Sequence, residues 1–172
     1  MDREEVLERL RTTRAEFDMR LSAIPPDALE VAPVGYEHAP KHVVAHVNAY
    51  ERLVVERLQA ARVGEQTAFD RDRDGWQRFN ARVWGEALEL DLATVLAESS
   101  RVFAELLDEV SRLTDDELNG VAGVTAAIDQ AWLDGHALWE LIGVDCFEHY
   151  PMHFPVLEAA AGGHEAGPGE DS

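Results

Sequence analysis

The chain has 172 residues, of which 34 are Asp or Glu and 15 are Lys or Arg, so its formal net charge is −19. This length predicts a single domain with room for a sizeable core, and a hydrophobic fraction of 46% excludes wholesale disorder. The negative charge argues against nucleic acid and anionic membrane surfaces as partners, because both attract basic faces.

The start of the chain and its cysteine content predict a cytoplasmic protein. The first residues, Met-Asp-Arg-Glu-Glu, are charged where a signal peptide needs an apolar core. Cys146 is the single cysteine, so no internal disulfide can form, which fits a reducing compartment. No run approaches the roughly 20 apolar residues of a membrane span.

Two helices are predicted in the first third of the chain. Apolar residues recur at helical spacing from Val6 until the Pro25–Pro26 pair ends the pattern. A second helix begins at Pro40, because proline suits the first helical position. Residues 62–75 are then mostly polar, and this composition predicts a connection rather than an element.

Helical patterning returns after this connection. A third helical region is predicted over residues 76–113, with a break near Asp91. Thr114 and Glu117 have the spacing of a capping box, which predicts a short helical turn. The last helix is predicted over residues 136–160. Residues 162–172 hold four Gly and no large apolar residue, so we expect a disordered acidic tail.

These elements predict an all-α fold, because no stretch alternates with period two for long enough to form a strand. Four long amphipathic helices in one small domain, residues 1–161, favour a four-helix bundle. The connection at residues 62–75 is about 14 residues long, whereas antiparallel neighbours are usually joined by two to eight. Such a connection can cross the length of the bundle and set the second and third helices parallel.

Histidine spacing is the main chemical signal. His42/His46 and His149/His153 are each four residues apart, which places both rings of a pair on one helix face, close enough to share a metal ion. On the last helix, His149 and His153 fall in the sector of the apolar stripe, at about 100° per residue. That stripe is formed by Leu138, Ile142, Cys146 and Val156. We therefore expect both rings to face the bundle interior.

Pro151 and Pro155 fall on the opposite sector of the same helix, so we expect them on its outer side, with a kink. On the second helix, His46 lies about 60° from the centre of the apolar face and His42 roughly 40° further out. His46 is therefore the candidate to join the pair on the last helix. Three neutral imidazoles leave coordination positions open, which suits catalysis. The pattern equally allows ordinary hydrogen-bonded core histidines.

Several other side chains are candidates for a pocket beside such a site. The polar and aromatic candidates are Tyr50, Asn80, Trp84 and Trp139, although aromatic residues at helical spacing more often belong to a plain core. Cys146 lies one turn before His149 and is either a ligand or nucleophile, or a buried small residue. No side chain is predicted as general acid or base, and no phosphate-binding glycine loop or dinucleotide fingerprint is present.

Two segments of the sequence resemble signatures of the DinB-like superfamily. Residues 41–51, KHVVAHVNAYE, are similar to its helix-two signature, an "AH" step with an aromatic residue four positions on. Residues 147–155, FEHYPMHFP, are similar to its helix-four signature, "EHYxxH". Residues 79–83 and 113–118 are most similar to the ClbS/DfsB branch, which provides self-protection against colibactin. The resemblance covers nearly the whole chain.

The resemblance implies a bundle of up-down-down-up connectivity with a long crossover between helices two and three, and a homodimer. It also implies a divalent zinc or nickel ion on three histidines, which carry over to His46, His149 and His153. This sequence has Tyr50 where the family usually has Trp, and prolines within the last helix.

Relatives of this kind transfer low-molecular-weight thiols, or hydrolyse or neutralise reactive small molecules. The resemblance therefore implies a metal-dependent hydrolase or thiol S-transferase of a detoxification or self-resistance type, with a thiol as a possible cosubstrate. The alternative hypotheses are a non-catalytic protein of the stress response that sequesters a small molecule in the bundle, and a structural stress protein that acts through its dimer surface.

Overall fold

The computed structural model describes residues 1–71, 75–120, 123–128 and 135–162. Within these ranges every regular element is helical, which confirms the predicted all-α class. The α-helices are α1 (Arg3–Ser22), α2 (Pro40–Arg62), α3 (Gly75–Glu89), α4 (Leu92–Ser111), α5 (Asp115–Asn119), α7 (Leu138–Ile142) and α8 (Phe154–Gly162). The predicted acidic tail, beyond Gly162, lies outside the described residues.

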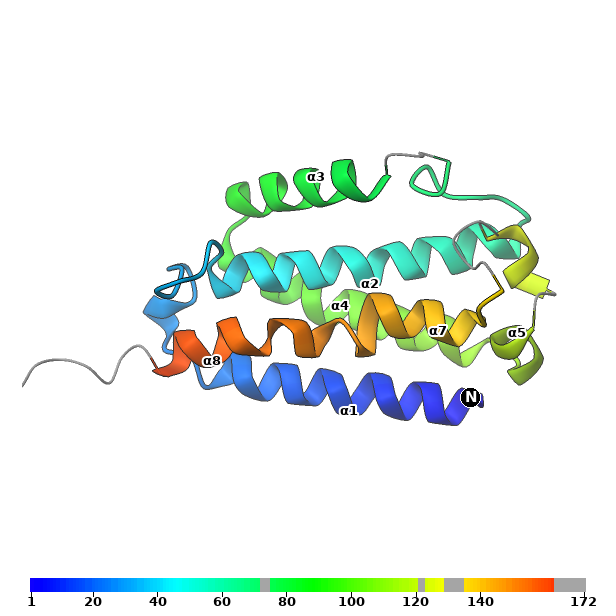
Figure 1. The fold of residues 1–172 in the computed structure, drawn as a ribbon, viewed down its shortest axis with the longest axis horizontal. Coiled ribbons are helices and arrows are strands. Elements are labelled where there is room, and N and C mark those ends of the chain that lie inside the picture. Colours follow the sequence, from blue (N-terminus) through cyan, green and yellow to red (C-terminus); the bar gives the residue numbers. More distant parts are fainter. Residues whose placement is uncertain (72–74, 121–122, 129–134, 163–172) are drawn as a thin grey trace, which may run out of the picture.

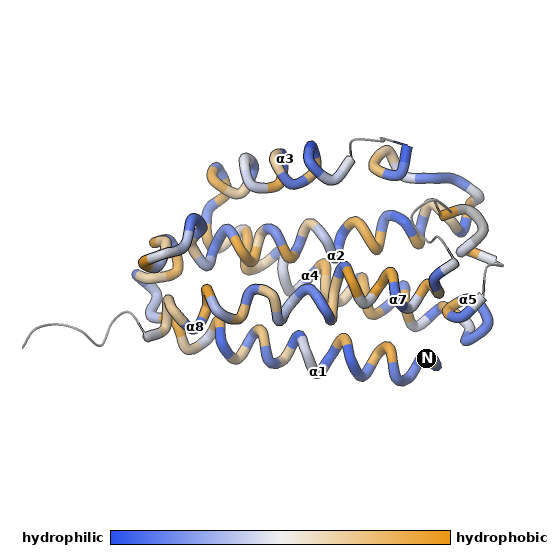
Figure 2. The backbone as a smooth tube through the Cα atoms, in the orientation of Figure 1, coloured by the Kyte–Doolittle hydropathy of each residue, from blue (hydrophilic) through white to orange (hydrophobic). Residues whose placement is uncertain are grey.

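Four rods form the bundle: α1, α2, α4 and the continuous segment from α7 to α8 (Figure 1). α2 and α4 run in one direction, whereas α1 and the α7–α8 rod run in the other (Figure 1). This arrangement confirms the up-down-down-up connectivity and the parallel second and third helices of the bundle. Hydrophobic and hydrophilic residues alternate along each rod (Figure 2), and the buried apolar residues of the rods form one core cluster.

The crossover between α2 and α4 contains a helix of its own. α3 lies against the outside of α2 and runs antiparallel to it (Figure 1). It packs there through Phe79 and Val83, which form a small apolar cluster with Leu53. The predicted third helical region is therefore two helices. They are separated near Asp91, as expected, and the Asp91 carboxylate caps α4 by accepting a hydrogen bond from the Thr94 backbone N–H at 2.8 Å.

The last rod departs from α-helical geometry in its middle. Gly143–Phe147 is a π turn, in which the Glu148 N–H donates to the Gly143 carbonyl at 2.8 Å, and Tyr150–His153 is a 3₁₀ turn. Pro151 has no N–H with which to continue the α-helical pattern. Both Pro151 and Pro155 are exposed, which confirms the prediction that they lie on the outer side.

A buried arginine joins three parts of the fold. The Arg57 side chain is 1% exposed, and its guanidinium pairs with Asp145 of the π turn at 2.9 Å and with Asp70 of the crossover at 2.8 Å. Burial raises the pKa of Asp145 to about 7; the Arg57 charge opposes this rise and the Asp70 charge adds to it. Two carboxylates thus depend on one guanidinium for their counter-charge.

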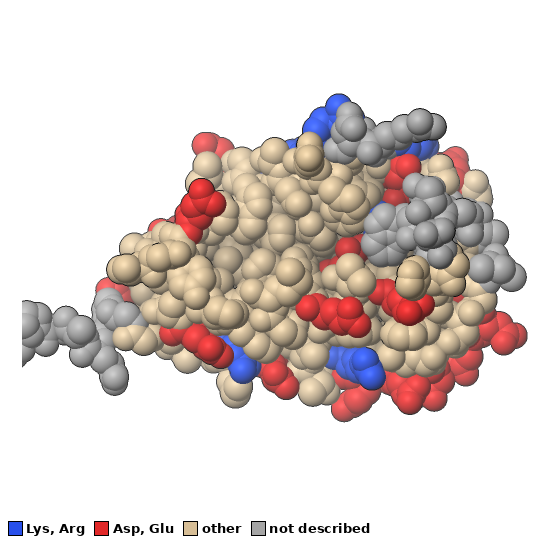
Figure 3. Space-filling view, viewed as in Figure 1, with Lys and Arg blue, Asp and Glu red and all other residues tan. Residues whose placement is uncertain are grey.

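Acidic side chains are scattered over the face of the molecule shown in Figure 3, with few basic side chains between them. They are most numerous at the lower right of this view, where α1 begins and α5 lies in Figure 1. None of the described helices is long and apolar enough to cross a bilayer.

Replacing Arg57 by Met should lower the free energy of unfolding by about 3–5 kcal/mol at pH 8, because two buried carboxylates lose their cation. The loss should be smaller at pH 5, since a carboxylate whose pKa is raised can take up a proton instead. Urea unfolding at both pH values measures this effect. Arg101→Met, which breaks surface pairs with Glu105 and Glu98, is the control and should cost about 1 kcal/mol or less. An equal loss in both variants would contradict the role of Arg57.

Candidate metal centre

Three histidines converge from two separate stretches of the chain. His46 lies on α2, whereas His149 and His153 lie in the irregular stretch between α7 and α8. The Nε2 atom of His149 is 3.2 Å from that of His46 and 3.1 Å from that of His153. One ring nitrogen from each histidine lies within 4.8 Å of the others. The structure thus brings together the three residues that the sequence singled out.

The two Nε2–Nε2 distances to His149 are compatible with ligands around one ion. With metal–nitrogen bonds of about 2.0–2.1 Å, adjacent ligand nitrogens lie about 3.0 Å apart in octahedral geometry and about 3.4 Å apart in tetrahedral geometry. Both Nε2–Nε2 contacts to His149 fall between these values. The same contacts also fit N–H···N hydrogen bonds between neutral rings. Metal binding at this site therefore stays a prediction.

Burial keeps the three imidazoles neutral. It lowers the pKa of His46 to about 3, with His149 and His153 adding repulsion. Burial also lowers the pKa of His149 to about 4, against an opposing contribution from the Asp145 backbone carbonyl. The pKa of His153 falls to about 4 for the same reason, with repulsion from His149. At neutral pH each ring therefore carries a lone pair available to a metal.

The orientation of the His46 ring comes from aromatic rings packed against it, not from a hydrogen bond at its Nδ1 atom. Its Nδ1 atom is buried and has no hydrogen-bond partner among the described residues. The Trp84 ring of α3 stacks on it at 4.4 Å and 7°, and the Tyr50 ring lies 4.7 Å away at 53°. Metal-binding histidines are usually oriented by a hydrogen bond from the second nitrogen. Here aromatic packing supplies that orientation.

Tyr50 and Asn80 complete this wall of the site. The Tyr50 ring lies 4.4 Å from the His149 ring, and its hydroxyl donates to Asn80 Oδ1 at 2.8 Å. Burial raises the pKa of Tyr50, and the hydrogen bond to Asn80 opposes that rise. Of the predicted pocket side chains, Tyr50 and Trp84 therefore lie against the histidine rings, and Asn80 is bound to Tyr50.

The structure separates the remaining candidates from the cluster. Trp139 lines a different hollow, with His136 and Glu140. Cys146 is fully buried, and burial raises its pKa well above the usual value, with the charges of Glu51 and Asp145 adding to the rise. Its thiol is not part of the potential ligand group in the described chain. His42 accepts a hydrogen bond from the Ala39 N–H at 3.3 Å and stays outside the cluster.

A buried ion pair behind His149 was missed by the sequence reasoning. Glu51 has no exposed surface, and it accepts hydrogen bonds from Arg14 at 2.5 Å and from the Tyr150 hydroxyl at 2.7 Å. Because Tyr150 follows His149, this pair helps to fix the backbone that carries the ligand. A signal was present in the sequence: Arg14 interrupts the apolar stripe of the first helix between Leu10 and Phe17.

Part of this site lies within a match to a known protein family. Residues 9–141 match the family model described as the DinB superfamily. The match includes His46 and ends before His149 and His153. No match was found among curated proteins.

Solved structures show the same fold. An uncharacterised protein from Escherichia coli UTI89 superposes with a TM-score of 0.77 at 17% identity, covering 96% of each chain. A protein from Streptococcus pneumoniae has a TM-score of 0.70 at 14% identity, covering 91% of this chain and 88% of the other. An uncharacterised protein from Clostridium difficile 630 has a TM-score of 0.70 at 15% identity, covering 91% and 94%.

Zinc affinity at the three histidines should change by less than about twofold between pH 8 and pH 6, because rings with lowered pKa values carry no proton that a metal must displace. An exposed histidine site, with pKa values near 6.5, would lose affinity across that range. Competition with a chromophoric chelator at pH 8, 7 and 6 measures it. A tenfold or larger loss at pH 6 would show that the rings are protonated in the folded protein.

Replacing Trp84 by Leu should weaken zinc binding by about 10–100-fold, the usual effect of removing a residue that orients a ligand. Trp84→Phe keeps an aromatic face and should stay within about threefold of the unchanged protein. Trp139→Leu is the control. Chelator competition gives the affinities, and the ring-current shift of the His46 protons reports the stacking without metal. Equal affinities for the Leu variants at positions 84 and 139 would contradict the orienting role.

Proposed function

The chain belongs to the DinB superfamily, and from this premise we propose that it is a metal-dependent enzyme that acts on a small reactive molecule by hydrolysis or thiol transfer. The observation that carries the proposal is the convergence of three imidazole nitrogens from α2 and the last rod, with His46 and His149 buried and His153 half-buried. Their lowered pKa values keep these rings neutral, so each has a lone pair available to a metal at neutral pH.

His46, His149 and His153 would hold a divalent ion, zinc or nickel. When bound at three neutral imidazoles, such an ion supplies Lewis acidity, which polarises an electrophile and lowers the pKa of a coordinated water or thiol. Three protein ligands leave coordination positions for these small molecules.

The protein side chains define which chemistry is available. Burial raises the pKa values of both Tyr50 and Cys146, so both are protonated at neutral pH. Tyr50 therefore donates a hydrogen bond and packs beside the histidines, and it does not act as a base. Since the Cys146 thiol is neither accessible nor ionised, a thiol-transfer reaction requires a low-molecular-weight thiol from solution as cosubstrate.

Two parts of the proposal, the branch of the superfamily and the homodimer, rest on the sequence resemblance. Residues 79–83 and 113–118 favour the ClbS/DfsB branch, and hence a detoxification or self-resistance role. The resemblance also predicts a homodimer. Both stay predictions.

Metal content is the first test. Purified protein loaded with zinc or nickel and then dialysed should retain about one ion per chain by elemental analysis, as three converging ligands predict. His149→Ala and His46→Ala should lose it. His42→Ala, which changes a histidine of the same helix outside the cluster, should retain it. If the unchanged protein retains no metal but binds a hydrophobic compound tightly, the sequestering function is favoured instead.

Activity is the second readout on the same variants. The loaded protein should hydrolyse p-nitrophenyl acetate, or join glutathione to 1-chloro-2,4-dinitrobenzene, at a rate that falls by at least about 100-fold in His149→Ala, as expected when a metal ligand is removed. His42→Ala should keep the rate. Equal rates in the two variants would show that any observed reaction does not occur at the histidines.

A further inference from the structure

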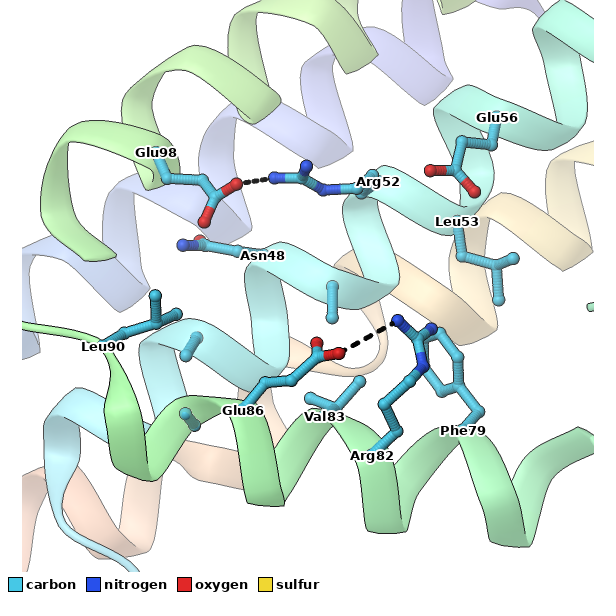
Figure 4. A pocket seen from close by; sticks show the side chains of 13 residues that line it. Asn48, Arg52, Leu53, Glu56, Phe79, Arg82, Val83, Glu86, Leu90 and Glu98 are labelled. Carbon is cyan, nitrogen blue, oxygen red and sulfur yellow. Dashed lines mark hydrogen bonds and ion pairs between the residues drawn. The ribbon is translucent and has the colours of Figure 1, made fainter. Parts of the chain in front are cut away.

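A second hollow lies on the α4 side of α3, away from the histidines. It is a cleft of about 350 Å³ between α2, α3 and α4, within the size range of small-ligand sites. Small and apolar side chains, among them Ala45, Ala49 and Val83, form its inner wall, and charged side chains surround its rim (Figure 4). None of the three histidines lines it.

One polar side chain in this cleft, that of Asn48, has a buried oxygen that accepts no hydrogen bond from the described residues. Asn48 is 2% exposed, and its amide nitrogen donates to the Val95 carbonyl at 3.0 Å. A buried acceptor without a donor is costly to the fold. A donor that reached this oxygen would therefore be favoured.

An ion pair covers Asn48. Arg52 of α2 pairs with Glu98 of α4, and Figure 4 shows this pair bridging the cleft beside the Asn48 side chain. The Arg52 side chain is 38% exposed and that of Glu98 is 26% exposed. Partly exposed pairs of this kind contribute little to stability, so the bridge can open at small cost. Arg101 also lies 3.5 Å from the Glu98 carboxylate, so opening the bridge leaves this carboxylate with one cation instead of two, next to the buried amide.

The charged side chains at the rim of the cleft favour a cation as its ligand. Glu86 is paired with Arg82 at 3.5 Å, and Glu56 makes no ion pair within the described part of the chain. The cleft therefore offers more acidic than basic groups, in a protein whose net charge of −19 already concentrates cations near its surface.

We propose that this cleft binds a small organic cation: a primary ammonium group on a short aliphatic body. The ammonium group takes the place of the Arg52 guanidinium at Glu98 and donates a hydrogen bond to the Asn48 amide oxygen. The aliphatic body lies against Ala45, Ala49 and Val83. An ammonium group fits both contacts because it carries a positive charge and three N–H donors.

The test is a titration of the full chain with n-butylammonium chloride, followed by NMR at the side-chain amide of Asn48 and at the backbone of α2, α3 and α4. Saturable shifts confined to the cleft are expected. Sodium butyrate, which has a similar body and the opposite charge, should not produce them. Shifts of the same residues by both probes would overturn the proposal.

Three variants separate the proposed contacts. Glu98→Gln should weaken n-butylammonium binding by at least tenfold, because it removes the charge that holds the ammonium group. Arg52→Gln should strengthen binding several-fold, because it removes one of the two internal cations at Glu98. Glu158→Gln, on α8 and paired with Arg20 at the surface, should bind like the unchanged protein. No gain in Arg52→Gln, or equal affinities in the two Glu→Gln variants, would overturn the proposal.

The same titration on metal-free His149→Ala protein keeps this site distinct from the proposed metal centre. Unchanged affinity for n-butylammonium supports a separate cleft, whatever the outcome of the metal experiments. Loss of binding in that variant would place the probe at the histidines and overturn the proposal. Thermal unfolding of each variant confirms that it is folded before its affinity is compared.

Discussion

The exclusion of water from three imidazole rings is the interaction on which the site depends. A chain with a net charge of −19 should favour protonated histidines through its overall field. Locally, however, burial dominates and lowers the pKa values of His46, His149 and His153 to about 3, 4 and 4. Each added proton would also repel the neighbouring rings. The acidic surface and the neutral cluster can therefore exist in one small protein, because the surface charges are solvated and distant.

The rigidity of this cluster comes from the elements packed behind and over it. The Glu51–Arg14 pair lies behind His149 and binds Tyr150, whereas Trp84 covers His46 from α3. The Arg57 pairs connect α2, the crossover and the π turn. These contacts support the irregular π and 3₁₀ backbone between residues 143 and 153. An irregular backbone can present two histidines at one point only if its surroundings determine its conformation.

Much of this arrangement follows from the sequence by local rules. Pro40 and Asp91 mark helix starts, and the prolines of the last rod mark its outer face, because capping and proline sterics act over a few residues. The choice of His46 over His42 follows from helical geometry. The path of α3 does not follow, because periodicity identifies an apolar face but not the neighbour that covers it. Nor do Arg14–Glu51 pairing and the position of Trp139, which depend on contacts between residues distant in sequence.

The histidines and the side chains that surround them come from different segments of the chain, because α3 lies outside the four rods. The imidazole nitrogens come from α2 and the α7–α8 rod, whereas Trp84 stacks on His46 and Asn80 binds Tyr50 from a helix attached to the outside of α2. Substitutions on the inner face of α3 can therefore change the surroundings of the histidines while the three rings stay in place. Variation in this one helix gives descendants of such a bundle a route to new substrates that does not require rebuilding the core.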